Sequence, residues 1–196
     1  MKKLLFSLMA LGFFISAQAQ NSLGAKKKTS IAFRLTAFDF GTAEKVQNSS
    51  IGSVLNAKQW AQYASTTKAL GFSYTSQYTE QVDIYSNIDL AVSRSPLTFS
   101  NAKLRSNENL MTSFESGVNI KMFKGDYRVN PYLTAGLGVR SFAFRDFSAY
   151  APVGFGLQIK TCKGSNLNLT TTYSTKMSKS FVTSYNYGVS YSFLLK

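Results

Sequence analysis

The sequence has 196 residues, a formal net charge of +13, one cysteine and no histidine. A single cysteine, Cys162, excludes an internal disulfide framework. The absence of histidine excludes a histidine-dependent catalytic dyad or triad and a histidine metal site. We therefore expect a protein that is not an enzyme and needs no cofactor or metal.

The N-terminus has the three parts of a secretory signal peptide. Lys2 and Lys3 form a basic segment, residues 4–15 form an apolar segment, and Ala17-Gln18-Ala19 is a small-residue cleavage site. Cleavage after Ala19 is the expected outcome.

The remainder fits one domain. We expect a polar lead over residues 20–29 and a β-barrel over residues 30–196, with an insertion at 41–69. A basic cytosolic chain would suggest nucleic acid, but the signal peptide takes this one out of the cytosol. Its charge is consistent with contact to an anionic surface such as lipopolysaccharide, or with a solvated basic rim.

The insertion at 41–69 interrupts the strand pattern. Its apolar residues recur at three- and four-residue steps, first at Ile51, Val54 and Leu55 and then at Trp60, Tyr63 and Ala64. This spacing predicts one or two short helices. They form either a cap or binding element over a barrel mouth, or a loop that packs its own apolar residues.

Eight segments alternate large apolar residues with small or polar ones, as strands with two different faces do. The last of them is long enough to cross a bilayer as a tilted strand. An unpaired strand edge is not tolerated in lipid, so we expect this strand to pair with the first and close a barrel. The eight segments are residues 30–40, 70–78, 82–94, 110–122, 130–142, 150–160, 167–176 and 181–193.

The connections between these segments alternate in length. Short turns follow the second, fourth and sixth segments, whereas long connections follow the first and third. Bacterial outer-membrane barrels have short periplasmic turns and longer external loops. Both chain ends are therefore predicted to be periplasmic, and the insertion at 41–69 to be external.

The polar faces of the segments indicate which side is inside. They combine glycines with charged residues of both signs, which suits a crowded lumen better than a solvent-facing surface. Buried charges must pair, so we expect a structural polar network inside the barrel. Its predicted members are Arg34, Asp83, Asp89, Glu115, Lys121, Arg140 and Lys160.

The aromatic residues near segment ends are interpreted as interfacial girdles. They are Phe38, Phe40, Tyr78, Phe142, Phe181 and Phe193. The alternative is a soluble barrel of the lipocalin type, in which the apolar face would point inward.

Three stretches, VNPYLTAGLGVRSFAF, YAPVGFGLQIK and YNYGVSYSF, carry a resemblance to a known family. Together they resemble the small OmpA-like outer-membrane β-barrels of Gram-negative bacteria. The resemblance implies an eight-stranded antiparallel up-and-down transmembrane barrel, here without the peptidoglycan-binding domain that many relatives carry. It also implies insertion by the outer-membrane assembly machinery, which reads the last strand through Tyr187, Val189, Tyr191 and Phe193. The sequence departs from the usual signal because Leu194, Leu195 and Lys196 follow the terminal aromatic residue.

Three functions remain open at this point. The first is a non-enzymatic barrel with a filled lumen that serves envelope integrity or surface contact. The second is a small pore or lipid-binding barrel. The third is an accessory subunit that docks another envelope protein through residues 41–69. Asp83, Asp89 and Glu115 are carboxylates that paired catalysis would need, but the cations on the same face favour structural pairing.

Overall fold

The computed structural model describes residues 28–57, 66–93, 98–99, 102–103, 109–124, 127–142, 144, 146–162, 164–177 and 183–195. The predicted signal peptide, most of the polar lead, and Trp60, Tyr63 and Ala64 lie outside these residues. The elements, in chain order, are β1 (Thr29–Asp39), α2 (Phe40–Asn48), α3 (Ile51–Asn56), β2 (Thr67–Gln77), β3 (Val82–Ser93), β4 (Thr98–Phe99), β5 (Ala102–Lys103), β6 (Asn109–Lys121), β7 (Val129–Phe142), β8 (Asp146–Cys162), β9 (Ser165–Lys176) and β10 (Ser184–Leu195).

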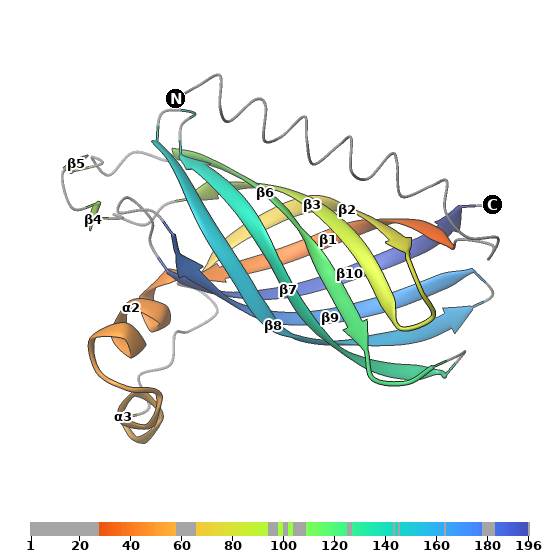
Figure 1. Cartoon of the computed structure of the whole chain (residues 1–196). Helices are drawn as coiled ribbons and strands as arrows, with labels where there is room; N and C mark the ends of the chain where they lie inside the picture. The colour runs from red at the N-terminus through yellow and green to blue at the C-terminus, as the bar shows by residue number, and fades with distance from the viewer. Residues whose placement is uncertain are drawn as a thin grey trace.

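The eight long strands form a closed barrel in the order β1-β10-β9-β8-β7-β6-β3-β2 (Figure 1). Strand β10 closes it by pairing with β1 from Thr29↔Leu195 to Asp39↔Tyr185. Each strand is antiparallel to its neighbours, so the chain runs up and down around the barrel. The predicted fold class is confirmed, including the closing role of the last strand.

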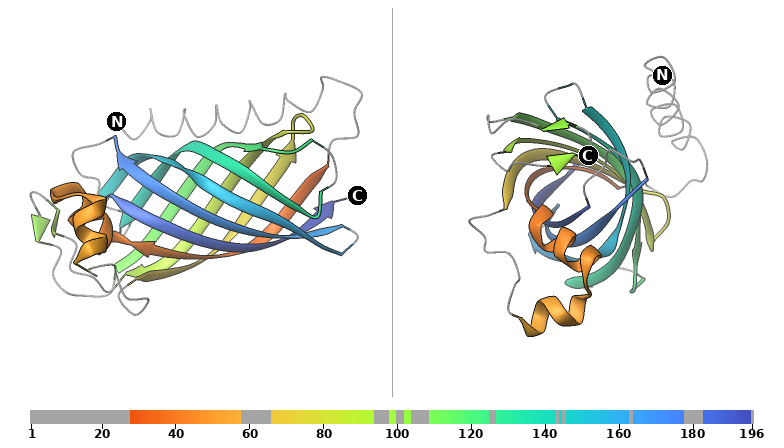
Figure 2. Two further views of the ribbon diagram at one scale, coloured as in Figure 1. Left: turned by 90° about the horizontal axis from the view of Figure 1, so that it is seen from below. Right: turned by 90° about the vertical axis from the view of Figure 1, so that its left-hand side faces the viewer.

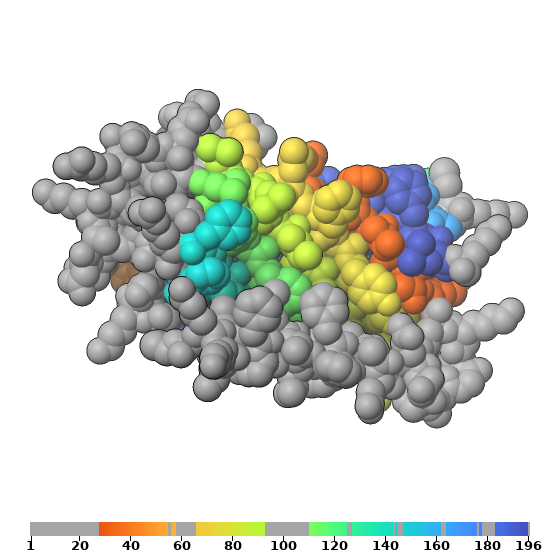
Figure 3. All heavy atoms as spheres, turned by 90° about the horizontal axis from the view of Figure 1, so that it is seen from above, coloured from red at the N-terminus to blue at the C-terminus, as the bar shows by residue number. Residues whose placement is uncertain are grey.

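The outer face of the barrel is apolar. Leu70 and Phe33 are 67% and 62% exposed, whereas Arg34 and Asp89, on the opposite faces of their strands, are almost completely buried. Figure 3 shows part of this outer face as one continuous surface over neighbouring strands. The alternation in the sequence therefore has the orientation of a membrane barrel, and the soluble alternative with an apolar interior is wrong.

The two ends of the barrel differ. One, the helical end, carries α2, α3 and the small β4-β5 sheet (Figures 1 and 2). The other, the terminal end, holds the start of β1, the end of β10 and the short connections β2-β3, β6-β7 and β8-β9. The last of these includes Gly164 at φ 90°, a backbone conformation that glycine adopts without strain.

The predicted helical insertion is confirmed over its described part. Asp39 caps α2, because its side chain accepts a hydrogen bond from the Thr42 backbone N–H at 2.9 Å. Thr183, just before β10, donates to Gln47 Oε1 of α2 at 3.4 Å. Helix α2 therefore stays across the barrel opening, as Figure 2 shows. Neither described helix is long and apolar enough to cross a membrane.

A closed barrel of this kind predicts a heat-dependent gel shift. The backbone hydrogen bonds continue around the whole barrel, and no strand has an unpaired edge. Detergent alone therefore has no free edge at which to begin unfolding. We expect an unboiled sample in detergent to migrate differently from a boiled one. A single band at the unfolded position in both samples would contradict a closed barrel.

Candidate functional site: the filled lumen

The interior of the barrel contains a charged pair that reaches across a whole strand. Arg34 of β1 and Asp89 of β3 are both register partners of Gly71 in β2, which lies between them. Arg34 Nε lies 3.6 Å from Asp89 Oδ1. Thr36 completes the contact, accepting from Arg34 Nε at 2.9 Å and donating to Asp89 Oδ1 at 3.2 Å. A side chain at position 71 would collide with the Asp89 carboxylate, so glycine there makes the pairing possible.

Glu115 of β6 lies in the middle of the lumen among neutral donors. Asn87 donates to Glu115 Oε1 at 3.4 Å, and the Tyr150 hydroxyl donates to Oε2 at 3.4 Å. These contacts come from β3 and β8, on either side of β6 and β7. The carboxylate thus links strands that are not adjacent in the sheet.

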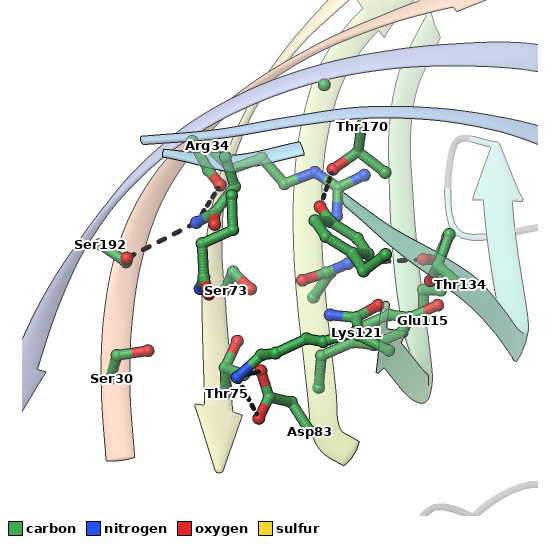
Figure 4. A pocket seen from close by; sticks show the side chains of 18 residues that line it. Ser30, Arg34, Ser73, Thr75, Asp83, Glu115, Lys121, Thr134, Thr170 and Ser192 are labelled. Carbon is green, nitrogen blue, oxygen red and sulfur yellow. Dashed lines mark hydrogen bonds and ion pairs between the residues drawn. The ribbon is translucent and has the colours of Figure 1, made fainter. Parts of the chain in front are cut away.

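A second ion pair lies nearer the terminal end. Lys121 Nζ lies 2.8 Å from Asp83 Oδ2 and donates to Oδ1 at 2.9 Å. Figure 4 shows the two side chains pointing toward each other inside the barrel. At these distances the pair forms charge-assisted hydrogen bonds to both carboxylate oxygens.

Inward-facing tyrosines fill the lumen between the charges. Tyr132 of β7 is the register partner of Gly156 of β8, and Tyr150 of β8 is the partner of Gly138 of β7. In each case a Cβ on the glycine would collide with the tyrosine ring. The hydroxyl of Tyr132 lies 2.7 Å from Thr170 Oγ1 on β9. Glycines on the polar face therefore make room for aromatic rings as well as for charges.

The helical end of the lumen is filled by Arg140 and aromatic rings. The fully buried guanidinium lies 4.6 Å from the ring centroid of Phe38, 5.3 Å from that of Phe40 and 4.8 Å from that of Tyr150. Its Nη1 donates to Ser184 Oγ at 3.2 Å. These distances are in the range of cation–π contacts.

A hydrophobic cluster surrounds these rings, and we call Arg140 together with the cluster the aromatic plug. The cluster consists of Phe38, Phe40, Ala69, Ala91, Met111 and Phe142. The interpretation of Phe38, Phe40 and Phe142 as interfacial girdle residues is therefore wrong, because all three are buried inside the barrel. Tyr78 and Phe193 are exposed on the surface, and Phe181 lies outside the described residues.

Below the plug, the described part of the lumen contains an inner chamber and a wider cavity. An inner chamber of about 50 Å³ is lined by Arg34, Tyr132 and Glu115, among others. A much larger cavity of about 880 Å³, the vestibule, opens at the terminal end. Asp83 and Lys121 line both cavities, so their ion pair stands between them.

The structure brings most of the predicted network residues together in three groups. Arg34 pairs with Asp89, Lys121 pairs with Asp83, and Arg140 lies in the aromatic plug. Lys160 lines the vestibule. Val189, Tyr191 and Phe193 of the last strand face outward, between 37% and 48% exposed. Among the described residues, no group of acidic, cysteine or histidine side chains is arranged to hold a metal ion.

Some lumenal residues were not among the predicted members of the network. Gly71 separates Leu70 and Phe72, so its position on the inward face was visible in the sequence. The inward position of the tyrosines could also be predicted, because they occupy the alternate positions of their strands, between the outward apolar residues. The partner of each residue was not visible, because it depends on the register between strands.

Removing one partner of the Arg34–Asp89 pair has a predictable effect on stability. The Arg34→Ala variant leaves the buried Asp89 carboxylate with two hydroxyl donors, Thr36 at 3.2 Å and Ser113 at 3.5 Å. We expect a loss of about 3–5 kcal/mol in the free energy of unfolding, as for other broken buried pairs. Urea titration of the folded barrel in lipid vesicles measures it.

Two further variants separate the pair from general damage. Lys124→Ala, at an exposed position outside the lumen, should leave the unfolding free energy unchanged. The double variant Arg34→Leu with Asp89→Leu should recover most of the loss, since no charge is then left unpaired. A double variant as unstable as Arg34→Ala would show that the charge pairing is not the cause.

Three solved structures resemble this barrel with a TM-score above 0.5. Neisserial surface protein A matches with a TM-score of 0.56 and 10% identity, over 87% of this chain and 98% of that one. The N-terminal β-barrel domain of Pseudomonas aeruginosa OprF matches with a TM-score of 0.53 and 12% identity, over 87% of this chain and 100% of that one. The outer membrane protein OprG from Pseudomonas aeruginosa matches with a TM-score of 0.51 and 8% identity, over 87% of this chain and 96% of that one.

No protein-family model and no curated protein matches the sequence. At these identities the structural matches establish the fold alone. The closed eight-stranded order, the apolar outer face and the filled polar lumen all agree with that fold. The chain has the fold of the small eight-stranded outer-membrane β-barrels, as the resemblance in its sequence predicts.

Proposed function

We propose that this protein is a sealed, non-enzymatic barrel of the outer membrane that works through its surfaces, in envelope integrity or surface contact. The aromatic plug carries this proposal, because it fills the lumen at the helical end with a fully buried arginine and packed rings. The two longest connections, between β1 and β2 and between β3 and β6, both lie at the helical end, which supports an external orientation for that end and a periplasmic one for the terminal end.

The rest of the lumen supports the same proposal. An eight-stranded barrel is only wide enough for side chains to fill its interior. Four charges in the middle of the lumen already contact each other, Arg34 with Asp89 and Lys121 with Asp83. A role as a small pore would require these pairs and the plug to separate together.

The outer surfaces supply the proposed contacts. The apolar face meets lipid, and the excess of basic residues favours the anionic groups of lipopolysaccharide around the barrel. The outward residues Val189, Tyr191 and Phe193 of β10 form the surface that the assembly machinery is proposed to read, together with Tyr187.

Conductance tests the sealed lumen. We expect the reconstituted protein to give no single-channel current in planar bilayers, because the plug and the ion pairs leave no continuous water path. Stable current steps from the unaltered protein would overturn the sealed-barrel proposal in favour of a small pore.

A thiol probe tests the plug itself. Ser148, 2% exposed and the register partner of Arg140, is replaced by cysteine in a Cys162→Ser background. A membrane-impermeant maleimide added to intact cells should not label it. Adding Phe38→Ala and Phe142→Ala should make it label, because two rings of the plug are then missing.

A matched variant controls for general loosening. Phe33→Ala removes a ring from the outer face of the same strand, β1, and should leave Ser148→Cys unlabelled. Equal labelling in this variant would show that the rings inside the barrel are not what excludes the reagent.

A second candidate function is partner docking through residues 41–69. Its support is that α2 is held by the Asp39 cap and by Gln47, while Ile51 of α3 remains 53% exposed. An exposed apolar side chain next to a helix that is fixed in place is available for contact with a partner. A single exposed isoleucine on a self-packed loop is the competing interpretation.

Co-purification separates these interpretations. If residues 41–69 dock an envelope protein, that protein should co-purify with the unaltered barrel and be lost from an Ile51→Glu variant. The exposed Glu44→Gln variant is the control and should retain it. Identical co-purifying proteins with all three versions would contradict docking through this insertion.

A further inference from the structure

The proposed function makes no use of the vestibule at the terminal end. Its volume of about 880 Å³ lies in the range of small-molecule sites, about 300–1,000 Å³. At its inner end it reaches the Lys121–Asp83 pair, which also lines the inner chamber of about 50 Å³. A small molecule that enters from the terminal end therefore meets this pair at the bottom of the vestibule.

Five hydroxyl and amide side chains line the vestibule on one side of the barrel. We call them the neutral belt: Ser30 on β1, Thr75 and Gln77 on β2, Gln158 on β8 and Asn166 on β9. Ser30 is the register partner of Thr75, and Figure 4 shows the two on adjacent strands. Strand β10 lies between β9 and β1 and adds Leu194, the other register partner of Ser30. The belt therefore follows a continuous part of the wall, from β8 round to β2.

The neutral belt differs from similar residues nearby in its hydrogen bonding. Deeper in the lumen, Asn168 donates to Ser190 Oγ at 3.4 Å. Asn130, which also lines the vestibule, donates to the Phe123 carbonyl at 2.9 Å. The five belt side chains are half-buried and make no side-chain hydrogen bond to another residue in the described part of the chain. Their donors and acceptors are therefore available to a molecule in the cavity.

The groups of the belt suit a ligand that is itself rich in hydroxyl groups. Amide and hydroxyl side chains both donate and accept hydrogen bonds, as each hydroxyl of a sugar does. Small-molecule sites combine such polar groups with apolar surface. Here Leu194 and Tyr127 supply it, and the half-exposed Tyr127 ring is held against Phe123, with 5.2 Å between the ring centroids. The carbon-bonded faces of a sugar ring can pack on these two side chains.

We propose that the vestibule binds a neutral oligosaccharide through the neutral belt. The volume of the cavity excludes folded macromolecules and admits a sugar of two or three rings. Charge plays no part in this recognition, since Lys121 and Asp83 pair with each other and Lys28 and Lys160 also have partners. The proposal depends neither on the aromatic plug nor on which end of the barrel is periplasmic.

Saturation-transfer NMR on the purified, folded barrel tests the site, in a detergent without sugar groups. The probes are three neutral trisaccharides: maltotriose, cellotriose and tri-N-acetylchitotriose. We expect at least one to bind with a Kd below about 1 mM, which should be the same at low and high salt. A polyethylene glycol of the same mass should not bind, because its ether oxygens accept hydrogen bonds but do not donate them.

Variants of the belt locate the binding. Gln77→Met and Gln158→Met remove an amide and nearly preserve the side-chain length, and each should raise the Kd about tenfold. Gln81→Met is the matched control, because Gln81 lies in the β2-β3 connection at the same end of the barrel and is not among the residues that line the vestibule. This variant should leave the Kd unchanged.

Four results would overturn the site. They are no binding of any of the three sugars, equal binding of polyethylene glycol, no change in Kd for either belt variant, and an equal loss for Gln81→Met. The heat-dependent gel shift is measured on every sample, and a lost shift identifies a variant that has not folded. Conductance is measured separately, so failure of the sugar site and failure of the sealed barrel are distinguishable.

A tethered probe identifies the source of the sugar. The trisaccharide that binds is coupled to beads through its reducing end by a long flexible linker. If the vestibule takes the end of a glycan chain, the beads should capture the barrel and free trisaccharide should release it. If it takes a whole soluble oligosaccharide, the free sugar should bind without capture by the beads. Either result supports a saccharide site and assigns its occupant.

Discussion

The closure of β10 on β1 is the constraint on which the rest of the molecule depends. It removes every free strand edge from the lipid and at the same time encloses an interior only a few side chains wide. Each inward residue must then both fit and find a partner for its polar atoms. Arg34, Asp89 and Thr36 meet both demands at once, because they pack side by side and satisfy one another.

The requirement for space explains the glycines, and the requirement for partners explains the tyrosines. Gly138 and Gly156 each leave room for a ring from the adjacent strand, and the hydroxyls of Tyr150 and Tyr132 then reach Glu115 and Thr170. A ring of this size fills volume while its hydroxyl satisfies a polar group. Around these tyrosines, the polar interior of the barrel is therefore closely packed, in contrast to the open vestibule.

Alternation along the sequence was sufficient to predict the strands, the inward face and most of the charged residues. The same alternation places Phe38 on the face of β1 that carries Arg34, and Phe142 on the face of β7 that carries Arg140. Both phenylalanines of the plug could therefore have been predicted to point inward. The girdle interpretation was wrong because it rested on residue type and closeness to a strand end, and not on which face of the strand the residue occupies. The pairing of Arg34 with Asp89 was beyond the sequence, since it depends on the register of β2 between them.

The two ends of the lumen follow different physical rules, and that difference bears on function. At the helical end, Arg140 is removed from water, and rings and Ser184 surround it, so opening that end would expose apolar rings to solvent. At the terminal end, Arg128 and Lys160 line the open vestibule instead of a packed core. In the sealed barrel that we propose, no solute passes between the two ends. Its external contacts and its vestibule can therefore be changed independently, because the packed lumen separates them.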